Sequence, residues 1–228
     1  MIPLKDNIPS RGFPFFTLLL IGVNVVIFIY ELSLGNLLER FVFVYGIVPK
    51  TFLSMQYADI KDSVNHFLPL ITATFLHGGW FHLLSNMWFL WLFGDNIESH
   101  IGHIRFLFFY LLCGVVGYLF HAVAQPQSMI PAIGASGAIA GVLGAYLYLY
   151  PGARIITLVP IFFFLTMVEV PAFLFLGFWF IIQFLNGLSC FAQVGCLEGG
   201  IAWWAHIGGF VCGLLYMMVF GRRVRRRR

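Results

Sequence analysis

The chain has 228 residues, of which 61% are apolar and 10% are charged, and its formal net charge is +4. Soluble domains usually carry about 25% charged residues, so this chain has too few polar side chains to cover a globule in water. The composition excludes an ordinary soluble protein and predicts an integral membrane protein with the lipid bilayer as its solvent.

Uncharged apolar stretches recur along the chain at the length that spans a bilayer, about 17–25 residues. The first, Phe13–Tyr30, is too long for the apolar region of a signal peptide, and we expect it to be a retained span. The others are a stretch ending at Gly94, Phe106–Val123, Ala132–Tyr150, a stretch starting near Pro171, and Ile201–Phe220. Ile155–Val168 is shorter and contains Pro160, so we expect it to lie at the membrane surface or to be re-entrant. The sequence thus predicts one all-α domain, residues 1–228, with six spans and with seven as the alternative.

The placement of positive charge distinguishes these two topologies. Six arginines lie within residues 222–228. Cytoplasmic flanks of spans are enriched in Lys and Arg, and six spans with the N-terminus inside place 10 of the 13 Lys and Arg residues in the cytoplasm. We therefore expect residues 1–12 and the arginine tail to be cytoplasmic and residues 13–221 to form the six-helix core. Beside an apolar span, such a tail indicates a topology anchor rather than a nucleic-acid site.

Four polar residues on three predicted spans share one depth. The second, fourth and sixth spans all run inward, and His82, Asn86, Ser136 and His206 each lie early in their span. At a rise of about 1.5 Å per residue, each lies within roughly a dozen ångströms of the outer helix end. Charged groups in hydrocarbon cost about 2.5–3.5 kcal/mol on insertion scales, so this layer indicates a functional site near the outer face.

Ser136 and His206 have the chemistry of a nucleophile and its base. A serine hydroxyl is a weak nucleophile until a neutral imidazole takes its proton. Two pairs of glycines have helix-packing spacing, Gly137-xxx-Gly141 after Ser136 and Gly209-xxx-Gly213 after His206, while Gly134 and Gly137 leave the serine unshielded. Such small-xxx-small seams let two helices approach closely. The pattern predicts a Ser136–His206 dyad, while plain helix packing and a histidine bonded between helices stay as alternatives.

His82 and Asn86 lie four residues apart, on one face of the second span. An amide donor aimed at a developing oxyanion is worth about 3–4 kcal/mol in serine hydrolases; the alternative is polar contact between helices. A zinc site from His77, His82 and His206 lacks an acidic or thiolate ligand. We therefore expect neither a metal nor another cofactor.

Three motifs together resemble the rhomboid family of intramembrane serine proteases, over about residues 13–221. They are His77-xxxx-His82-xxx-Asn86, the Gly-Ala-Ser-Gly block at 134–137, and Ala205-His206 followed by Gly209 and Gly213. The resemblance implies a six-helix bundle with a cavity open to the extracytoplasmic side, in which transmembrane segments of membrane proteins are cleaved.

The resemblance also implies roles for individual residues. Ser136 is the nucleophile and His206 the base, and His82 and Asn86 form the oxyanion hole with the Ser136 backbone N–H. His77 has a structural place at the base of the first outer loop, and Glu98 ties the turn after the second span.

The chain departs from the family pattern at two places. Many members have Trp-Arg in the first outer loop, where this chain has Leu68-Pro69, and many have an aromatic residue four positions after the serine, where this chain has Ala140. Neither change removes a catalytic group, so we expect an active protease in a bacterial inner membrane. A catalytically inactive relative that binds membrane helices is the alternative, and a transporter or channel is disfavoured because the polar residues stop in the outer layer.

Two features of the fifth span and its flank stay open. The span is crowded with aromatic residues, which fits either lipid contact or a lateral gate as the family resemblance implies. Cys190 and Cys196 flank a short outer loop and have the spacing for a disulfide in an oxidising compartment.

Overall fold

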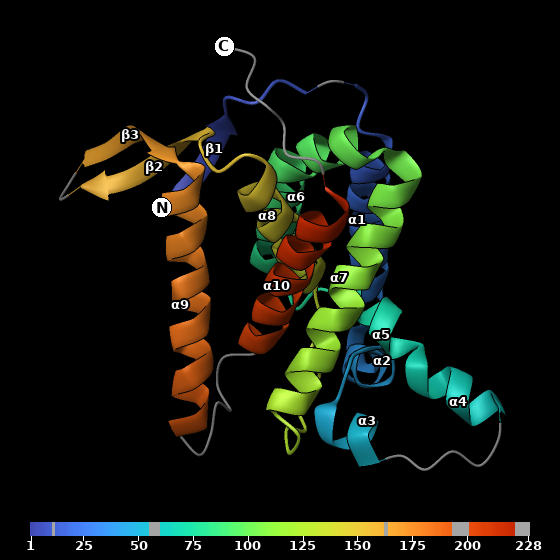
Figure 1. Cartoon of the computed structure of the whole chain (residues 1–228). Helices are drawn as coiled ribbons and strands as arrows, with labels where there is room; N and C mark the ends of the chain where they lie inside the picture. Colours follow the sequence, from blue (N-terminus) through green and yellow to red (C-terminus); the bar gives the residue numbers. More distant parts are fainter. Residues whose placement is uncertain (11, 55–59, 162–163, 193–200, 222–228) are drawn as a thin grey trace.

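A computed structural model describes residues 1–10, 12–54, 60–161, 164–192 and 201–221, and these residues are mainly helical. Figure 1 shows a bundle of long helices, short helices at one end and a small sheet at the other. The long helices are α1 (Phe15–Ser33), α6 (Trp80–Ile101), α7 (His103–Ala124), α8 (Ser136–Leu149), α9 (Ala172–Ala192) and α10 (Trp203–Phe220). The short helices are η1 (Gly35–Leu37), α2 (Leu38–Tyr45), α3 (Pro49–Ser54), α4 (Ile60–Phe67), α5 (Pro69–Thr72) and η2 (Ala73–Phe75). The strands are β1 (Ile2–Asp6), β2 (Arg154–Ile161) and β3 (Phe164–Pro171).

Each of the six predicted spans contains one long helix. Four of these, α1, α7, α9 and α10, are long and apolar enough to cross a membrane. A fifth span is obtained if the segment Val64–Phe75 and α6, which meet at 81°, are counted as one bent unit, while α8 is apolar but has 14 residues. The helices therefore identify an integral membrane protein, and the count of six stays a prediction.

The predicted helical membrane domain is confirmed in its main feature, but the described residues also include an antiparallel sheet in the order β1-β2-β3, which the all-α prediction did not contain. Within the stretch Ile155–Val168, residues 155–161 belong to β2 and residues 164–168 to β3, which pair antiparallel. The expected position of this stretch at the membrane surface stays a prediction. Its many β-branched residues favour a strand. Pro160 is tolerated because β1 pairs with β2 only as far as Leu158, so no strand on that side needs its missing N–H.

The N-terminal strand is fixed to the helices by polar contacts. Asp6 is buried and accepts hydrogen bonds from Asn96 Nδ2 at 2.9 Å and from the Tyr146 hydroxyl. Burial raises the pKa of the Asp6 carboxyl above its usual range. Trp88 Nε1 donates to the Pro3 carbonyl oxygen at 2.6 Å. Strand β1 thus joins α6 and α8 to the hairpin that leads into α9.

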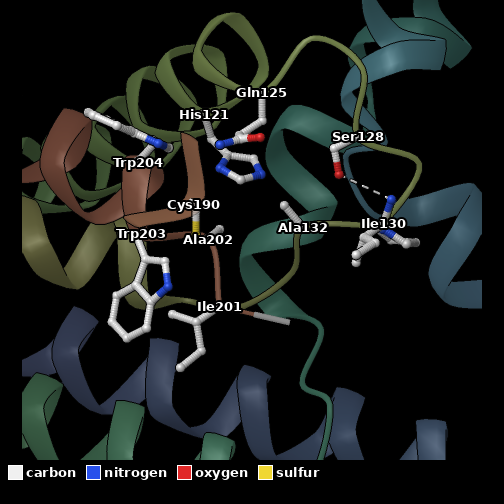
Figure 2. A pocket seen from close by; sticks show the side chains of 11 residues that line it. His121, Gln125, Ser128, Ile130, Ala132, Cys190, Ile201, Ala202, Trp203 and Trp204 are labelled. Atoms are coloured by element: carbon white, nitrogen blue, oxygen red, sulfur yellow. Dashed lines mark hydrogen bonds between the residues drawn. The ribbon is translucent and has the colours of Figure 1, made fainter. Parts of the chain in front are cut away.

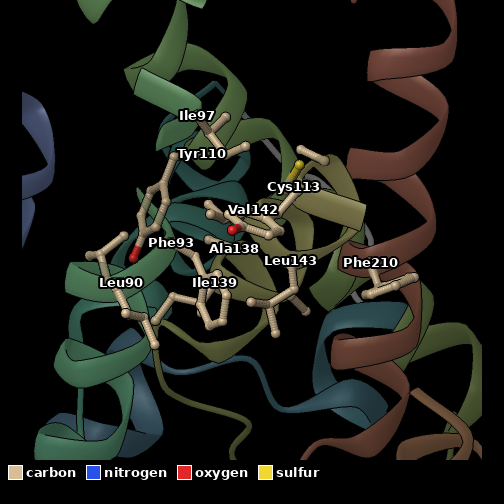
Figure 3. Close-up of a cluster of buried hydrophobic side chains, with 14 of the residues drawn as sticks. Leu90, Phe93, Ile97, Tyr110, Cys113, Ala138, Ile139, Val142, Leu143 and Phe210 are labelled. Carbon is tan, nitrogen blue, oxygen red and sulfur yellow. The ribbon is translucent and has the colours of Figure 1, made fainter. Parts of the chain in front are cut away.

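Helix α8 lies at the centre of the bundle, and its small residues explain how it fits there. Its buried side chains form one apolar cluster with those of α6, α7 and α10 (Figure 3). A Cβ atom at Gly209 would overlap the carbonyl oxygen of Gly137, and one at Gly213 would overlap that of Gly141. The two glycine seams therefore pack face to face and bring the backbones of α8 and α10 into contact.

Glu98 connects the end of α6 to the beginning of α1. Its buried carboxylate accepts hydrogen bonds from Phe16 N and Thr17 N, both at 2.8 Å, and from Thr17 Oγ1 at 2.7 Å. It also bonds His103 at the start of α7. Since the first N–H groups of a helix have no partner within it, Glu98 caps α1 from a different helix.

Candidate active site

Ser136 and His206 form a hydrogen-bonded pair at one end of the glycine seam. Ser136 is the first residue of α8, and His206 lies in the first turn of α10. His206 Nε2 lies 2.7 Å from Ser136 Oγ. The imidazole is buried, whereas Ser136 is half-buried. The close approach of α8 and α10 therefore brings the Ser136 hydroxyl within hydrogen-bonding distance of the His206 imidazole, while Ser136 stays partly accessible.

The second nitrogen of His206 bonds a residue that the sequence did not single out. His206 Nδ1 lies 2.7 Å from Gln183 Oε1 of α9, and Gln183 is 6% exposed. The available signal was an uncharged polar side chain within a strongly apolar, aromatic-rich helix. The dyad thus continues into a third buried polar group.

An aromatic neighbour of His206 also comes from α9. The ring centroid of Trp179 lies 5.9 Å from that of His206, with 31° between the planes. Trp203 adds an edge contact at 6.1 Å. Ala140, where many relatives have an aromatic residue, is fully buried. Trp179 therefore supplies from α9 the ring contact that α8 lacks.

His82, Asn86 and Gly134 meet two residues before Ser136 in the chain. Gly134 has φ +119°, and a Cβ atom there would lie 2.6 Å from His82 Nε2 and 3.6 Å from Asn86 Nδ2. His82 Nδ1 accepts the Gly78 N–H at 3.3 Å, so the hydrogen of the neutral ring is on Nε2, toward Gly134. Asn86 Nδ2 is buried and has no hydrogen-bond partner among the described residues. Two donors therefore converge beside the serine, where only glycine leaves room for another atom.

His77 is held by contacts with α1 and η2. Its backbone N–H lies 3.1 Å from a carboxylate oxygen of Glu31, and its Nδ1 lies 3.3 Å from the Phe75 carbonyl oxygen. Its ring lies 5.1 Å from that of His82. In the part of the chain that the structure describes, no group of three His, Cys, Asp or Glu residues is arranged to hold a metal ion.

A pocket lies between the end of α7 and the segments that lead to Ser136 and His206 (Figure 2). His121 and Gln125 line it from α7, and each has a buried nitrogen without a hydrogen-bond partner among the described residues. Ala132 and Ala202 line it shortly before the starts of α8 and α10. Cys190 also lines it and is disulfide-bonded. The partner predicted for that bond, Cys196, lies outside the described residues.

Comparisons with known proteins agree with the resemblance seen in the motifs. A family model described as the Rhomboid domain matches residues 64–223. The chain is 32% identical over 173 residues to the mitochondrial Rhomboid protein 1 of Saccharomyces cerevisiae, covering 74% of this chain and 46% of that protein. It is 30% identical over 216 residues to the Rhomboid protease GluP of Bacillus subtilis, covering 94% of this chain and 38% of that protein. The chain thus spans less than half the length of these relatives. Over its own length, which holds the Ser136–His206 pair, it belongs to the rhomboid family.

Proposed function

We propose that the protein is a serine endopeptidase that cleaves transmembrane segments of membrane proteins near the outer membrane face. The observation that carries this proposal is the 2.7 Å contact between His206 Nε2 and Ser136 Oγ. It is supported by Asn86 Nδ2, which is buried and has no hydrogen-bond partner among the described residues. Relatives named as rhomboid proteases support a protease of this kind.

In the first step, Ser136 Oγ attacks the carbonyl carbon of the scissile peptide bond while His206 Nε2 takes the hydroxyl proton. The tetrahedral intermediate collapses to an acyl-enzyme as His206 returns this proton to the leaving amine. His206 then takes a proton from a water molecule, which attacks the ester carbon. As the ester bond breaks, His206 returns this proton to Ser136 Oγ and the second product is released as the carboxylic acid. The half-buried position of Ser136 leaves one side of its hydroxyl open for this attack.

The negative charge of the tetrahedral oxygen develops beside Gly134. Asn86 Nδ2, His82 Nε2 and the Ser136 backbone N–H at the start of α8 are the donors that stabilise it. An unpaired buried amide is costly in the free protein. Asn86 therefore gains its hydrogen bond when the oxyanion forms, which is the differential binding that lowers a barrier.

Substrates are single-pass or other transmembrane proteins whose helix is locally unfolded at the cut. A peptide bond within a helix is hydrogen-bonded and shielded, so Ser136 cannot reach its carbonyl carbon. Helix-weakening residues near the cut favour cleavage for this reason. The glycines beside the serine leave space for the substrate backbone, which favours small side chains at the scissile bond.

The proposed topology has α1, α6, α7, α8, α9 and α10 as six spans of a single domain, with both termini in the cytoplasm. The active-site cavity then opens to the extracytoplasmic side, because Ser136 and His206 both lie at the outer starts of their helices. In this proposal the bilayer is the inner (plasma) membrane of a bacterium; the relatives come from mitochondria as well as from a bacterium.

A reporter tests this function. A single-pass segment with Gly and Pro near its outer end is co-expressed with the wild-type protein or with Ser136→Ala, and cleavage is measured by immunoblot. Wild type is expected to cleave it and Ser136→Ala is not, while a matched all-Leu segment stays intact. Equal cleavage by both proteins would remove Ser136 from the mechanism. No cleavage of any such reporter would favour the inactive, helix-binding alternative.

A further inference from the structure

Two of the side chains that contact the His206 ring come from α9. Gln183 Oε1 lies 2.7 Å from Nδ1, and the Trp179 ring is tilted by 31° over the imidazole. Trp179 and Gln183 are four residues apart, so they lie on one face of α9. Figure 1 shows α9 at the edge of the bundle, beside α10 and joined at one end to the sheet. A helix at the periphery thus holds the base of the dyad.

The Gln183 contact determines which nitrogen of His206 carries hydrogen. An amide oxygen only accepts hydrogen bonds, so Nδ1 is the protonated nitrogen of the neutral ring. Nε2 is then left with the lone pair that faces Ser136 Oγ at 2.7 Å. This is the tautomer that a general base requires, and the wrong tautomer lowers kcat about 10⁴-fold in a soluble Ser-His-Asp protease.

We propose that Gln183 is a positioning residue for the reaction. It holds His206 in the tautomer whose Nε2 accepts a proton, so His206 acts as a base only while α9 is packed against α10. The inference rests on the function proposed above. Because no carboxylate is hydrogen-bonded to His206 among the described residues, Gln183 takes the orienting place in a Ser136–His206–Gln183 relay.

The competing explanation is that Gln183 serves only as polar contact between two membrane helices. Such bonds stabilise the association of membrane helices only weakly on average. If the contact were purely structural, its loss would destabilise the fold and would affect probe binding and probe reaction alike. Loss of a positioning residue lowers the rate of nucleophilic attack while the protein stays folded. A substituted side chain of the same length that also accepts a hydrogen bond restores the rate.

The test uses the full-length protein in detergent micelles with a small fluorescent fluorophosphonate, whose reaction with serine needs no peptide substrate. The rate of inactivation, kinact, and the apparent affinity, KI, are measured for wild type, Gln183→Leu and Gln183→Glu. Asn186→Leu is the matched control, because it removes an amide three residues further along α9. Gel filtration confirms that each variant is folded, and Gln183→Met replaces Gln183→Leu if the latter aggregates.

Gln183→Leu is expected to lower kinact about 10- to 100-fold with KI unchanged, the range seen when the outer hydrogen-bond partner of a metal-site histidine is removed. Gln183→Glu is expected to restore most of the rate, because a carboxylate oxygen at the same reach accepts the Nδ1 hydrogen. Asn186→Leu should match wild type. An unchanged kinact in Gln183→Leu, or equal losses in the Leu and Glu variants, would overturn the positioning role alone. No labelling of folded wild type would overturn the proposed function and this inference with it.

Discussion

Removing the Glu98 carboxylate is predicted to destabilise the protein far more than removing an exposed one. Glu98 is 1% exposed and accepts hydrogen bonds from Phe16 N, Thr17 N and Thr17 Oγ1. In Glu98→Ala all three donors lose their acceptor. A negative charge at the start of α1 is lost as well, where the helix dipole favours it.

The size of the effect follows from the donors left unpaired. Each buried donor without a partner costs about 1–3 kcal/mol. Part of the end of α1 stays accessible to water, so we expect a loss of about 3–6 kcal/mol in the free energy of unfolding of Glu98→Ala. Glu98→Gln keeps one acceptor oxygen but turns an amide N–H group toward these donors. It is expected to lose about 1–3 kcal/mol.

Thermal unfolding in detergent, followed by gel filtration of the heated sample, measures the difference. At 2–4 °C per kcal/mol for a domain of this size, Glu98→Ala should lower Tm by at least about 6 °C. The control is Glu169→Ala, which removes an exposed carboxylate paired with Arg154 at 2.9 Å. Exposed ion pairs contribute about 0–1 kcal/mol. If both variants unfold at the same temperature, the assignment of Glu98 as the cap of α1 is wrong.

Two further substitutions test the oxyanion site and the helix seam. Asn86→Ala should lower the rate of fluorophosphonate labelling about 10²- to 10³-fold with KI unchanged, because it removes an oxyanion donor; an unaltered rate would contradict that role. Gly209→Ala places a Cβ on the carbonyl oxygen of Gly137 and should lower the free energy of unfolding by about 1–3 kcal/mol. It should also lower the rate of fluorophosphonate labelling. Gly22→Ala, where a Cβ meets nothing within 4 Å, is its control, and equal stability of the two variants would rule out close packing of α8 and α10.

The sequence predicted the features that depend on local pattern. Apolar runs bounded by charged or turn residues located all six long helices, and the direction of alternate spans placed Ser136 and His206 at one depth. The close packing of α8 against α10 follows from a spacing of four between glycines, whereas the helix itself is shorter than the predicted span Ala132–Tyr150.

The sheet and the Gln183 contact depend on tertiary structure, and the sequence did not reveal them. Ile155–Val168 is apolar without alternation, so its periodicity does not distinguish a strand from a buried helix. Gln183 is separated from His206 by 23 residues and lies on another helix. No spacing rule connects two such positions, because the rotation of α9 about its own axis decides which side chain faces the imidazole.

The central claim is that Ser136 is an activated nucleophile whose base is His206. Membranes containing wild type, Ser136→Ala or His206→Ala are treated with a fluorescent fluorophosphonate and resolved on a gel, with equal amounts of folded protein verified by gel filtration. The account predicts a labelled band for wild type and none for either variant. Labelling of Ser136→Ala, or its absence in folded wild type, would contradict it.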